Sequence, residues 1–314
     1  MGNTINPYIC LHEKLIILMN HNKYTAFVLS FILLLAVVLP ISATKRALLI
    51  GIGVQQDDSW GKINGDRDIA YLTEILKKSG YAEIDSLKNE QATKKGIVNS
   101  LIHLAKQSQP GDVVFISFSG HGQQMTDING DESDVDELDE TWIPYDAKLK
   151  YSDDYRGENH LVDDELNGYL KSIYESIGEE GKMLVLVDAC HAGGSTRGSS
   201  TSANTTEIVR GVSDVFMLPM LPDDRIKSER SETLQMPWLT LSACLSYQKN
   251  FEMASPKVGR LTYTLYSLFE KGISFEEIYH FMNVSRSQSR LKQYPQLEGD
   301  TLKYNLKDFF EYAR

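Results

Sequence analysis

An α/β fold with a mostly parallel central sheet is predicted by this sequence of 314 residues, on three observations. Continuous apolar runs, typical of strands buried on both faces, recur along the chain. Segments with apolar residues at helical spacing separate them. The apolar content of 42% and the charged content of 24% are ordinary for a globular protein. Because strands that alternate with helices form a parallel sheet covered on both faces, we expect a three-layer α/β/α sandwich.

The first 43 residues have the layout of a secretory signal peptide. A weakly basic stretch precedes an apolar run over residues 26–39, and the small residues Ser42 and Ala43 follow. The run is shorter than the roughly 20 residues that a membrane span needs. We therefore expect export and cleavage, with Met19 as a candidate start. An uncleaved N-terminal anchor is the alternative.

Residues 44–314 are expected to form a single domain. Apolar runs predict strands over residues 46–54, 112–122, 182–194 and 237–246. Helical periodicity, with Gly and Pro stop signals, predicts helices over residues 66–80, 93–112, 163–181, 261–272 and 274–288. A Ser/Thr-rich stretch over residues 195–236 is long for a loop and predicts a flexible linker. It separates a larger part, residues 44–194, from a smaller part, residues 237–314.

Charge and cysteine content restrict the function. The formal net charge of -11 argues against nucleic acid or an anionic membrane as the main partner. Of the three cysteines, Cys10 would be lost with the signal peptide, which leaves Cys190 and Cys244. An exported protein could pair them, but a disulfide framework usually has more cysteines at tighter spacing. A reduced thiol in an exported protein would indicate a chemical role.

Two predicted strands end on residues that suit nucleophilic catalysis. In a parallel sheet, sites form beyond the carboxyl ends of the strands, and here one such end carries His121 and another carries Cys190. If the two strands are neighbours, the imidazole can take the thiol proton and later donate it to a leaving amine. The backbone N–H groups of Gly122 and Cys190 are candidates for an oxyanion hole.

Other interpretations of these residues stay open. A buried cysteine is usually a small hydrophobic residue, and a histidine after a strand is often structural. His191 is a second candidate base. Cys244 is a second candidate nucleophile, but glycines do not flank it, and we interpret it as a packing residue.

The motifs together resemble the peptidase C14 caspase-like family, most of all its metacaspase branch and the bacterial relatives of that branch. The resemblance covers about Lys45 to the C-terminus and rests on "FISFSGHGQQ", "DELDETWIPYDA", "LVDDEL", "VLVDACHAGGS" and "LTLSACLSYQKNFE". It implies a caspase-like sandwich that hydrolyses peptide bonds through a thioester, with Cys190 as nucleophile and His121 as general base and acid. The caspase signature Gln-Ala-Cys is replaced by Asp188-Ala189-Cys190, which disfavours cleavage after aspartate.

The same resemblance implies cleavage after Arg or Lys. In metacaspases, an aspartate before the nucleophile and another in the first strand-to-helix connection line the pocket for a basic side chain. Asp188 matches the first and Asp68, rather than Asp66, matches the second. Stabilisation of a helix N-terminus is the alternative role for Asp66 and Asp68. We also expect self-cleavage after a basic residue between 195 and 231, where the arginines are Arg197, Arg210, Arg225 and Arg230.

We expect no obligatory cofactor, while the resemblance implies calcium as an activator. Its matching positions are Asp139, Asp163 and Asp164, although the family's further aspartate, soon after the nucleophile, is missing and Arg197 falls near its place. Residues 126–140 do not form an EF-hand, because Glu132 replaces the required glycine. A solvated charge run is the alternative.

The sequence thus favours an exported cysteine endopeptidase whose partner is a polypeptide substrate, without nucleic acid and without stable membrane association after cleavage. A catalytically silent binding or scaffold domain with the same fold is one alternative. A hydrolase of small molecules that uses the same dyad is another, since one fold hosts many chemistries.

Overall fold

A six-stranded sheet forms the centre of the protein in the computed structural model, which describes residues 43–127, 138–190, 208–212, 214–219, 236–246, 248–283 and 293–312. The strand order is β2-β1-β3-β7-β8-β9. Its strands are β1 (Lys45–Gly51), β2 (Glu83–Lys88), β3 (Val113–Ser119), β7 (Lys182–Asp188), β8 (Leu239–Ser242) and β9 (Gln296–Gly299). All neighbours pair in parallel except β8 and β9.

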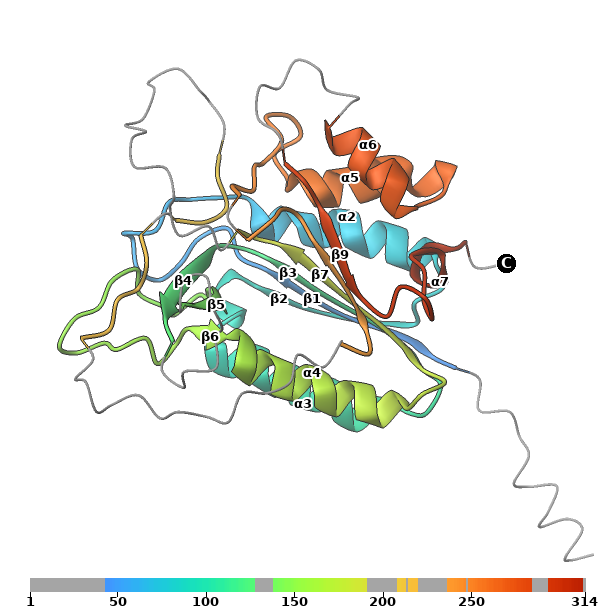
Figure 1. Ribbon diagram of the computed structural model, residues 1–314, viewed down its shortest axis with the longest axis horizontal. Helices are drawn as coiled ribbons and strands as arrows, with labels where there is room; N and C mark the ends of the chain where they lie inside the picture. The colour runs from blue at the N-terminus through green and yellow to red at the C-terminus, as the bar shows by residue number, and fades with distance from the viewer. Residues whose placement is uncertain are drawn as a thin grey trace, which may run out of the picture. The chain divides into compact units, whose positions relative to one another are not determined.

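Helices cover both faces of this sheet (Figure 1). On one face lie α2 (Gly65–Lys78), α5 (Arg260–Leu268), α6 (Phe275–Asn283) and the short α7 (Lys307–Phe310), and on the other lie α3 (Lys94–Gln107) and α4 (Asp163–Ile177). Short 3-10 turns are η1 (Asn89–Gln91) and η2 (Phe269–Lys271). The expected three-layer sandwich with a mostly parallel sheet is therefore confirmed.

Alternation along the central strands builds two cores. All seven residues of β3 are buried, and Phe115 contacts the core under α2 and α5 while Ile116 and Phe118 contact the core under α3 and α4. Successive side chains of a strand point to opposite faces, so a continuous apolar run fills both cores at once. This is why the sequence periodicity identified the central strands.

A second, three-stranded antiparallel sheet lies beside the carboxyl end of β3. It consists of β4 (Gly122–Thr126), β5 (Leu138–Trp142) and β6 (Leu161–Val162). The sequence analysis assigned no strand to these residues, nor to β2 or β9. The predicted 274–288 helix is seen as α6, and its residues after 283 lie outside the described part of the chain.

The predictions for the N-terminal segment and the linker concern residues that are largely outside the described part of the chain. Residues 1–42 lie outside the described part of the chain, so the signal peptide and the start at Met19 stay predictions. Of the predicted linker 195–236, residues 208–212, 214–219 and 236 are described. Within the described ranges no helix combines the length and the apolar character that crossing a membrane requires.

Candidate functional site

His121 and Cys190 occupy equivalent places at the carboxyl ends of two neighbouring strands. β3 and β7 pair in parallel, and Ser119 is the register partner of Asp188. Each candidate residue follows its strand partner by two positions, so both belong to the same face of the sheet. Both side chains are buried, with exposed fractions of 2%. The expectation that these two strands are neighbours is met.

The imidazole of His121 is oriented by the loop after β1. Its Nε2 lies 2.7 Å from the carbonyl oxygen of Gly61, and its ring stacks on Trp60 with centroids 5.1 Å apart. Because a carbonyl only accepts, Nε2 carries the proton of the neutral ring, which leaves Nδ1 as the basic atom. Nδ1 is buried without a hydrogen-bond partner among the described residues. Burial lowers the pKa of His121 to about 4, so the ring is neutral at pH 7.

The thiol of Cys190 donates to the backbone carbonyl of Gln248, with Sγ 2.6 Å from that oxygen. Cys244, which follows β8, lies beside it, because its Sγ is 3.4 Å from the same oxygen. The interpretation of Cys244 as a plain packing residue is thus incomplete. Its burial is as expected, but its contact with the Cys190 thiol was missed.

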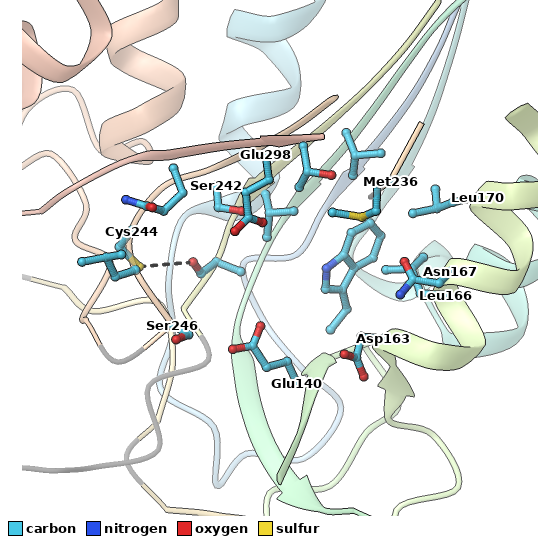
Figure 2. A pocket seen from close by; sticks show the side chains of 17 residues that line it. Glu140, Asp163, Leu166, Asn167, Leu170, Met236, Ser242, Cys244, Ser246 and Glu298 are labelled. Atoms are coloured by element: carbon cyan, nitrogen blue, oxygen red, sulfur yellow. Dashed lines mark hydrogen bonds between the residues drawn. The ribbon is translucent and has the colours of Figure 1, made fainter. Parts of the chain in front are cut away.

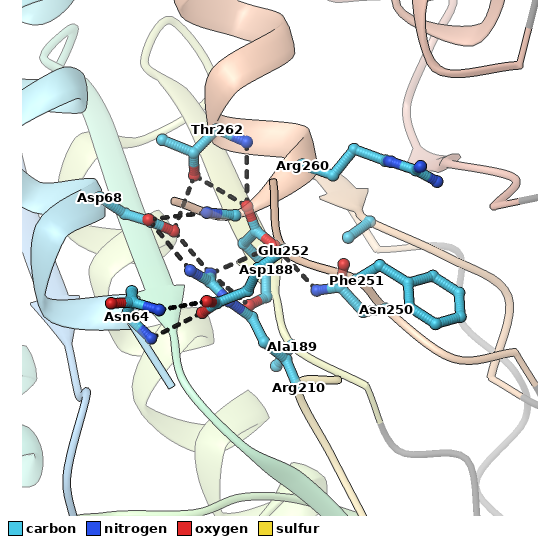
Figure 3. A network of polar contacts seen from close by, with 12 residues as sticks. Asn64, Asp68, Asp188, Ala189, Arg210, Asn250, Phe251, Glu252, Arg260 and Thr262 are labelled. Atoms are coloured by element: carbon cyan, nitrogen blue, oxygen red, sulfur yellow. Dashed lines mark hydrogen bonds and ion pairs between the residues drawn. The ribbon is translucent and has the colours of Figure 1, made fainter. Parts of the chain in front are cut away.

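A buried acidic pocket lies on the α2 and α5 side of the sheet, next to Cys190. We define the acidic pocket as Asp68 of α2, Asp188 of β7 and Glu252, and Figure 3 shows all three side chains around one guanidinium. All three carboxylates are buried, with at most 5% exposure. The two predicted aspartates are therefore brought together, whereas Asp66 pairs with Lys88 at 3.1 Å. Glu252 was missed by the sequence analysis.

Hydrogen bonds fix the carboxylates of the pocket. Asp188 accepts from the Nδ2 of Asn250 at 2.8 Å and from the N and Oγ1 of Thr262 at 2.9 and 2.8 Å. Asp68 accepts from the backbone N of Gly259 at 2.9 Å. A Cβ at Gly259 would lie 2.1 Å from Asp188 Oδ2, so the close approach of the backbone requires glycine there.

Arg210 of the predicted linker fills this pocket. Its Nη1 and Nη2 donate to the two oxygens of Asp68 at 2.6 and 3.0 Å, and its Nε donates to Glu252 at 3.0 Å. Its Nη1 also lies 3.3 Å from Asp188 Oδ1. Burial of the side chain, which is 0% exposed, disfavours the charge, but the neighbouring carboxylates outweigh it and raise the pKa of Arg210. The pocket thus binds a guanidinium in its charged form.

The backbone around Arg210 pairs as an added strand. Val209 and Phe251 form an antiparallel bridge, in which Arg210 N donates to Asn250 O and Glu252 N donates to Ile208 O, both at 2.9 Å. A Cβ at Gly211 would lie 2.4 Å from the backbone carbonyl oxygen of Cys190 and 3.0 Å from the Cβ of Cys190. The residue that follows Arg210 therefore packs against the backbone and the Cβ of the candidate nucleophile. We call residues 208–211 the arginine segment.

The predicted calcium ligands are not gathered into one site. Asp139 lies on β5, and Asp163 and Asp164 begin α4. Asp163 lines a cavity together with Glu140, and alternation along β5 sends the adjacent Asp139 to the opposite face. Among the described residues no group of three or more His, Cys, Asp or Glu side chains is arranged to hold a metal ion. Residues 128–137 of the acidic loop lie outside the described part of the chain, so calcium binding stays a prediction and no step is derived through calcium.

The remaining predicted residues are only partly described. Gly122 is the first residue of β4 and follows His121 directly, so it stays next to the dyad. His191, Arg197, Arg225 and Arg230 lie outside the described residues.

The sequence is similar to a known protein family and to curated proteins. Residues 45–197 match the family described as "Metacaspase, peptidase C14 domain". The chain is 32% identical to Metacaspase-2 of Arabidopsis thaliana over 164 residues, which are 49% of this chain and 36% of that protein. It is 31% identical to Metacaspase-1 of Schizosaccharomyces pombe over 160 residues, 48% and 34% of the two chains. The chain thus spans about a third of the length of these curated relatives.

Two solved structures share the fold. Protein GSU0716 from Geobacter sulfurreducens is similar with a TM-score of 0.58 and 21% identity, over 86% of this chain and 100% of that one. Caspase-1 from Spodoptera frugiperda is similar with a TM-score of 0.54 and 10% identity, over 82% and 89% of the two chains. At these identities the likeness concerns the fold alone.

Proposed function

Because the chain belongs, through residues 45–197, to the peptidase C14 caspase-like family, we propose that it is a cysteine endopeptidase of the metacaspase type that cleaves polypeptides after Arg or Lys. The observation that carries this proposal is Arg210 in the acidic pocket. A guanidinium held by three carboxylates, on a strand whose next residue packs against a cysteine, has the arrangement of a bound substrate. Substrate residues would bind as the arginine segment does.

The pocket chemistry supports a basic residue over an acidic or apolar one. Bidentate pairing with Asp68 uses the planar fork of a guanidinium, and charge-assisted bonds of this kind are the strong ones. A lysine would present a single ammonium to the same carboxylates and would pair without the bidentate geometry. An aspartate would place a fourth buried carboxylate in the pocket, which is electrostatically unfavourable. The expected preference is therefore Arg, then Lys.

In the proposed reaction His121 and Cys190 act as a dyad. Nδ1 of His121 takes the thiol proton, and the Cys190 sulfur attacks the carbonyl carbon of the basic residue. The oxyanion would be bound by backbone N–H groups, for which Cys190 and Gly122 are the candidates. The C–N bond breaks when His121 returns the proton to the leaving amine, and water then hydrolyses the thioester.

The Gly61 carbonyl supports this division of roles within the imidazole. It accepts the hydrogen bond of Nε2, which lies 2.7 Å from the oxygen, so Nδ1 is left to exchange a proton with the thiol. In the present arrangement the Cys190 thiol donates to Gln248. A rotation of the cysteine side chain away from that carbonyl would precede attack.

Processing and location are parts of the same proposal. We propose that the chain cleaves itself between Arg210 and Gly211, since Gly211 already packs against Cys190. We further propose that the protein is exported by its N-terminal segment and that millimolar calcium activates it, as the sequence predicts. Export and activation by calcium are inferred from the sequence alone.

A covalent probe tests the proposal. A peptidyl chloromethyl ketone with Arg at the reactive position should alkylate Cys190 in the full-length chain, whereas the same peptide with Asp should not. Peptide mapping by mass spectrometry identifies the labelled cysteine. Asp68→Asn should slow labelling, and the matched variant Asp66→Asn, changed on the same helical turn, should not. Labelling of Cys244 in place of Cys190, or equal labelling by the Asp peptide, would reject the assignment.

The alternatives give different results in the same experiment. A catalytically silent scaffold would react slowly with both peptides, and His121→Ala would not slow the labelling of its cysteine further. A hydrolase of small molecules would react without any dependence on Asp68.

A further inference from the structure

Cys190 and Cys244 form a pair of thiols at the carboxyl ends of β7 and β8. The two strands are parallel neighbours, and the pairing continues past Ser242, because Ala243 N donates to Val187 O at 2.9 Å. Both sulfurs contact the oxygen of Gln248, at 2.6 Å for Cys190 and 3.4 Å for Cys244. Both residues are thiols, with exposed fractions of 2% and 7%. The proposed peptidase reaction uses only one of them.

The distance between the two backbones suits a disulfide. In the register of β7 and β8 Cys244 falls opposite Ala189, so Cys190 is its diagonal neighbour; with strands about 4.8 Å apart this pair stays within the Cα separations of about 4.4–6.8 Å that disulfides span. The Cys244 sulfur also lies 3.9 Å from the carbonyl oxygen of Ala189, the residue before Cys190. A hydrogen bond with Cys190, burial and nearby negative charge raise the pKa of Cys244 and keep it a thiol at neutral pH. The closeness of the two sulfurs, and not the acidity of Cys244, places it as a resolving partner, and its proton leaves as the new bond forms.

A cavity gives small molecules a route to one member of this pair, Cys244. Figure 2 shows Cys244 at one end of a cavity of about 420 Å³ between α4 and the sheet. Val187 and Ala189 line it, so it lies on the opposite face of the sheet from Asp188 and the acidic pocket. Access to Cys244 therefore does not require Arg210 to leave its pocket.

We propose that Cys190 and Cys244 form a reversible disulfide on exposure to a hydroperoxide and that this bond switches the peptidase off. The Cys190 sulfur attacks the peroxide oxygen, which gives a sulfenic acid and releases an alcohol, or water when the oxidant is hydrogen peroxide. The Cys244 sulfur then displaces hydroxide from the sulfenic sulfur, and the thiol proton leaves with it as water. The sum is two thiols plus ROOH giving a disulfide, ROH and water, with the two electrons taken by the O–O bond.

Inactivation by the disulfide rests on the proposed function, because it assumes that Cys190 is the peptidase nucleophile. Formation of the disulfide does not depend on that assumption. The disulfide would protect Cys190, because a sulfenic acid without a neighbouring thiol is oxidised further to sulfinic and sulfonic acids, and this oxidation is irreversible for most proteins. A thiol in contact captures the sulfenic acid first, and a dithiol reductant restores both thiols by exchange. The exported location proposed above would expose the pair to oxidants.

The test treats the full-length chain with hydrogen peroxide, blocks remaining thiols and maps peptides by mass spectrometry. We expect a cross-linked pair of peptides containing Cys190 and Cys244, about 2 Da lighter than the sum of the reduced peptides because two hydrogens leave. The cross-link should be absent in Cys244→Ala and in Cys244→Ser. Oxidation of Cys190 to sulfinic acid in the wild type without any such cross-link would overturn the proposal.

Activity provides the second readout. Wild-type peptidase should lose turnover with peroxide and regain most of it with dithiothreitol. Cys244→Ala should lose turnover and fail to regain it, each variant being compared with its own untreated activity. Equal recovery in both proteins would overturn the switch. A cross-link in a chain that never hydrolyses peptides would instead establish the disulfide and reject the proposed function.

Discussion

Removal of the arginine from the acidic pocket is the perturbation whose consequences are most fully determined by the contacts. Arg210→Ala leaves Asp68, Asp188 and Glu252 buried without the guanidinium that neutralises them. Deletion of one partner of a buried ion pair is far more costly than loss of a surface pair, because an uncompensated charge stays in the interior. We therefore expect Arg210→Ala to lower the free energy of unfolding strongly.

The expected loss is about 3–5 kcal/mol, the range for a broken buried pair, since Arg210 and its three partners are at most 5% exposed. For a domain of this size, each kcal/mol lowers the melting temperature by about 2–4 °C, so a fall of about 6–20 °C follows. Arg210→Lys should lose less, because it keeps the charge but not the bidentate bond. The surface control Arg67→Ala should stay within about 0.5 kcal/mol of the parent.

The assay is thermal unfolding of each variant in a Cys190→Ala background, which keeps the chain intact. Addition of a small guanidinium compound should then distinguish a removable occupant from a fixed structural residue. A ligand that refills the pocket at 100 times its Kd raises stability by about 2.7 kcal/mol. A melting temperature unchanged by Arg210→Ala, or a loss that no guanidinium compound reverses, would refute the view of Arg210 as a bound substrate-like residue.

Three further predictions concern the reaction and its control. Burial lowers the pKa of His121 to about 4 and keeps the base neutral as the pH falls, so the acid limb of kcat/KM should lie near pH 4. Since the histidine of the unfolded chain titrates at about 6.5, the free energy of unfolding should fall as the pH drops from about 6.5 to about 4. An acid limb of kcat/KM at about pH 6.5 would contradict burial as the cause. Intact-mass analysis of active protein should show two associated fragments divided between Arg210 and Gly211, absent from Cys190→Ala and Arg210→Gln, and a single uncut species in an active preparation would reject self-cleavage there. Turnover should rise with calcium in the millimolar range, and Asp163→Ala should blunt the response; activity indifferent to calcium and chelator would remove this prediction.

The central strands and the helices were predictable from sequence because burial on both faces leaves a pattern that is local. Phe115 and Ile116 are adjacent in sequence and belong to opposite cores, so the strand is apolar throughout. The edge strand β2 was missed because it is half exposed and carries Glu83, Asp85 and Lys88. β4, β5 and β9 were missed because they are short and largely polar, and β6 because it has only two residues; pairing with distant segments makes them strands.

The difference between local patterns and contacts of distant segments also explains which residues of the candidate site could be predicted. His121 and Cys190 were found because each ends an apolar strand, and Asp68 and Asp188 through resemblance. The role of Arg210 was not visible, because its partner Asp68 lies 142 residues away and several arginines of the linker looked alike. The contact of Cys244 with Cys190 was not visible either, because Cys244 falls opposite Ala189 in the register of β7 and β8 and the two sulfurs meet only beyond the strand ends, at the carbonyl of Gln248.

Substrate preference is the measurement that tests the central claim most directly. Full-length protein is assayed with fluorogenic peptides that differ only in Arg, Lys, Asp or Leu before the scissile bond, alongside Cys190→Ala and Asp188→Ala. We expect cleavage after Arg and then Lys, none with Cys190→Ala, and kcat/KM for Arg lowered about 30- to 5,000-fold in Asp188→Ala, the equivalent of about 2–5 kcal/mol for the loss of one buried charge partner. A preference for Asp or Leu, or wild-type turnover of the Arg peptide by Cys190→Ala, would contradict it.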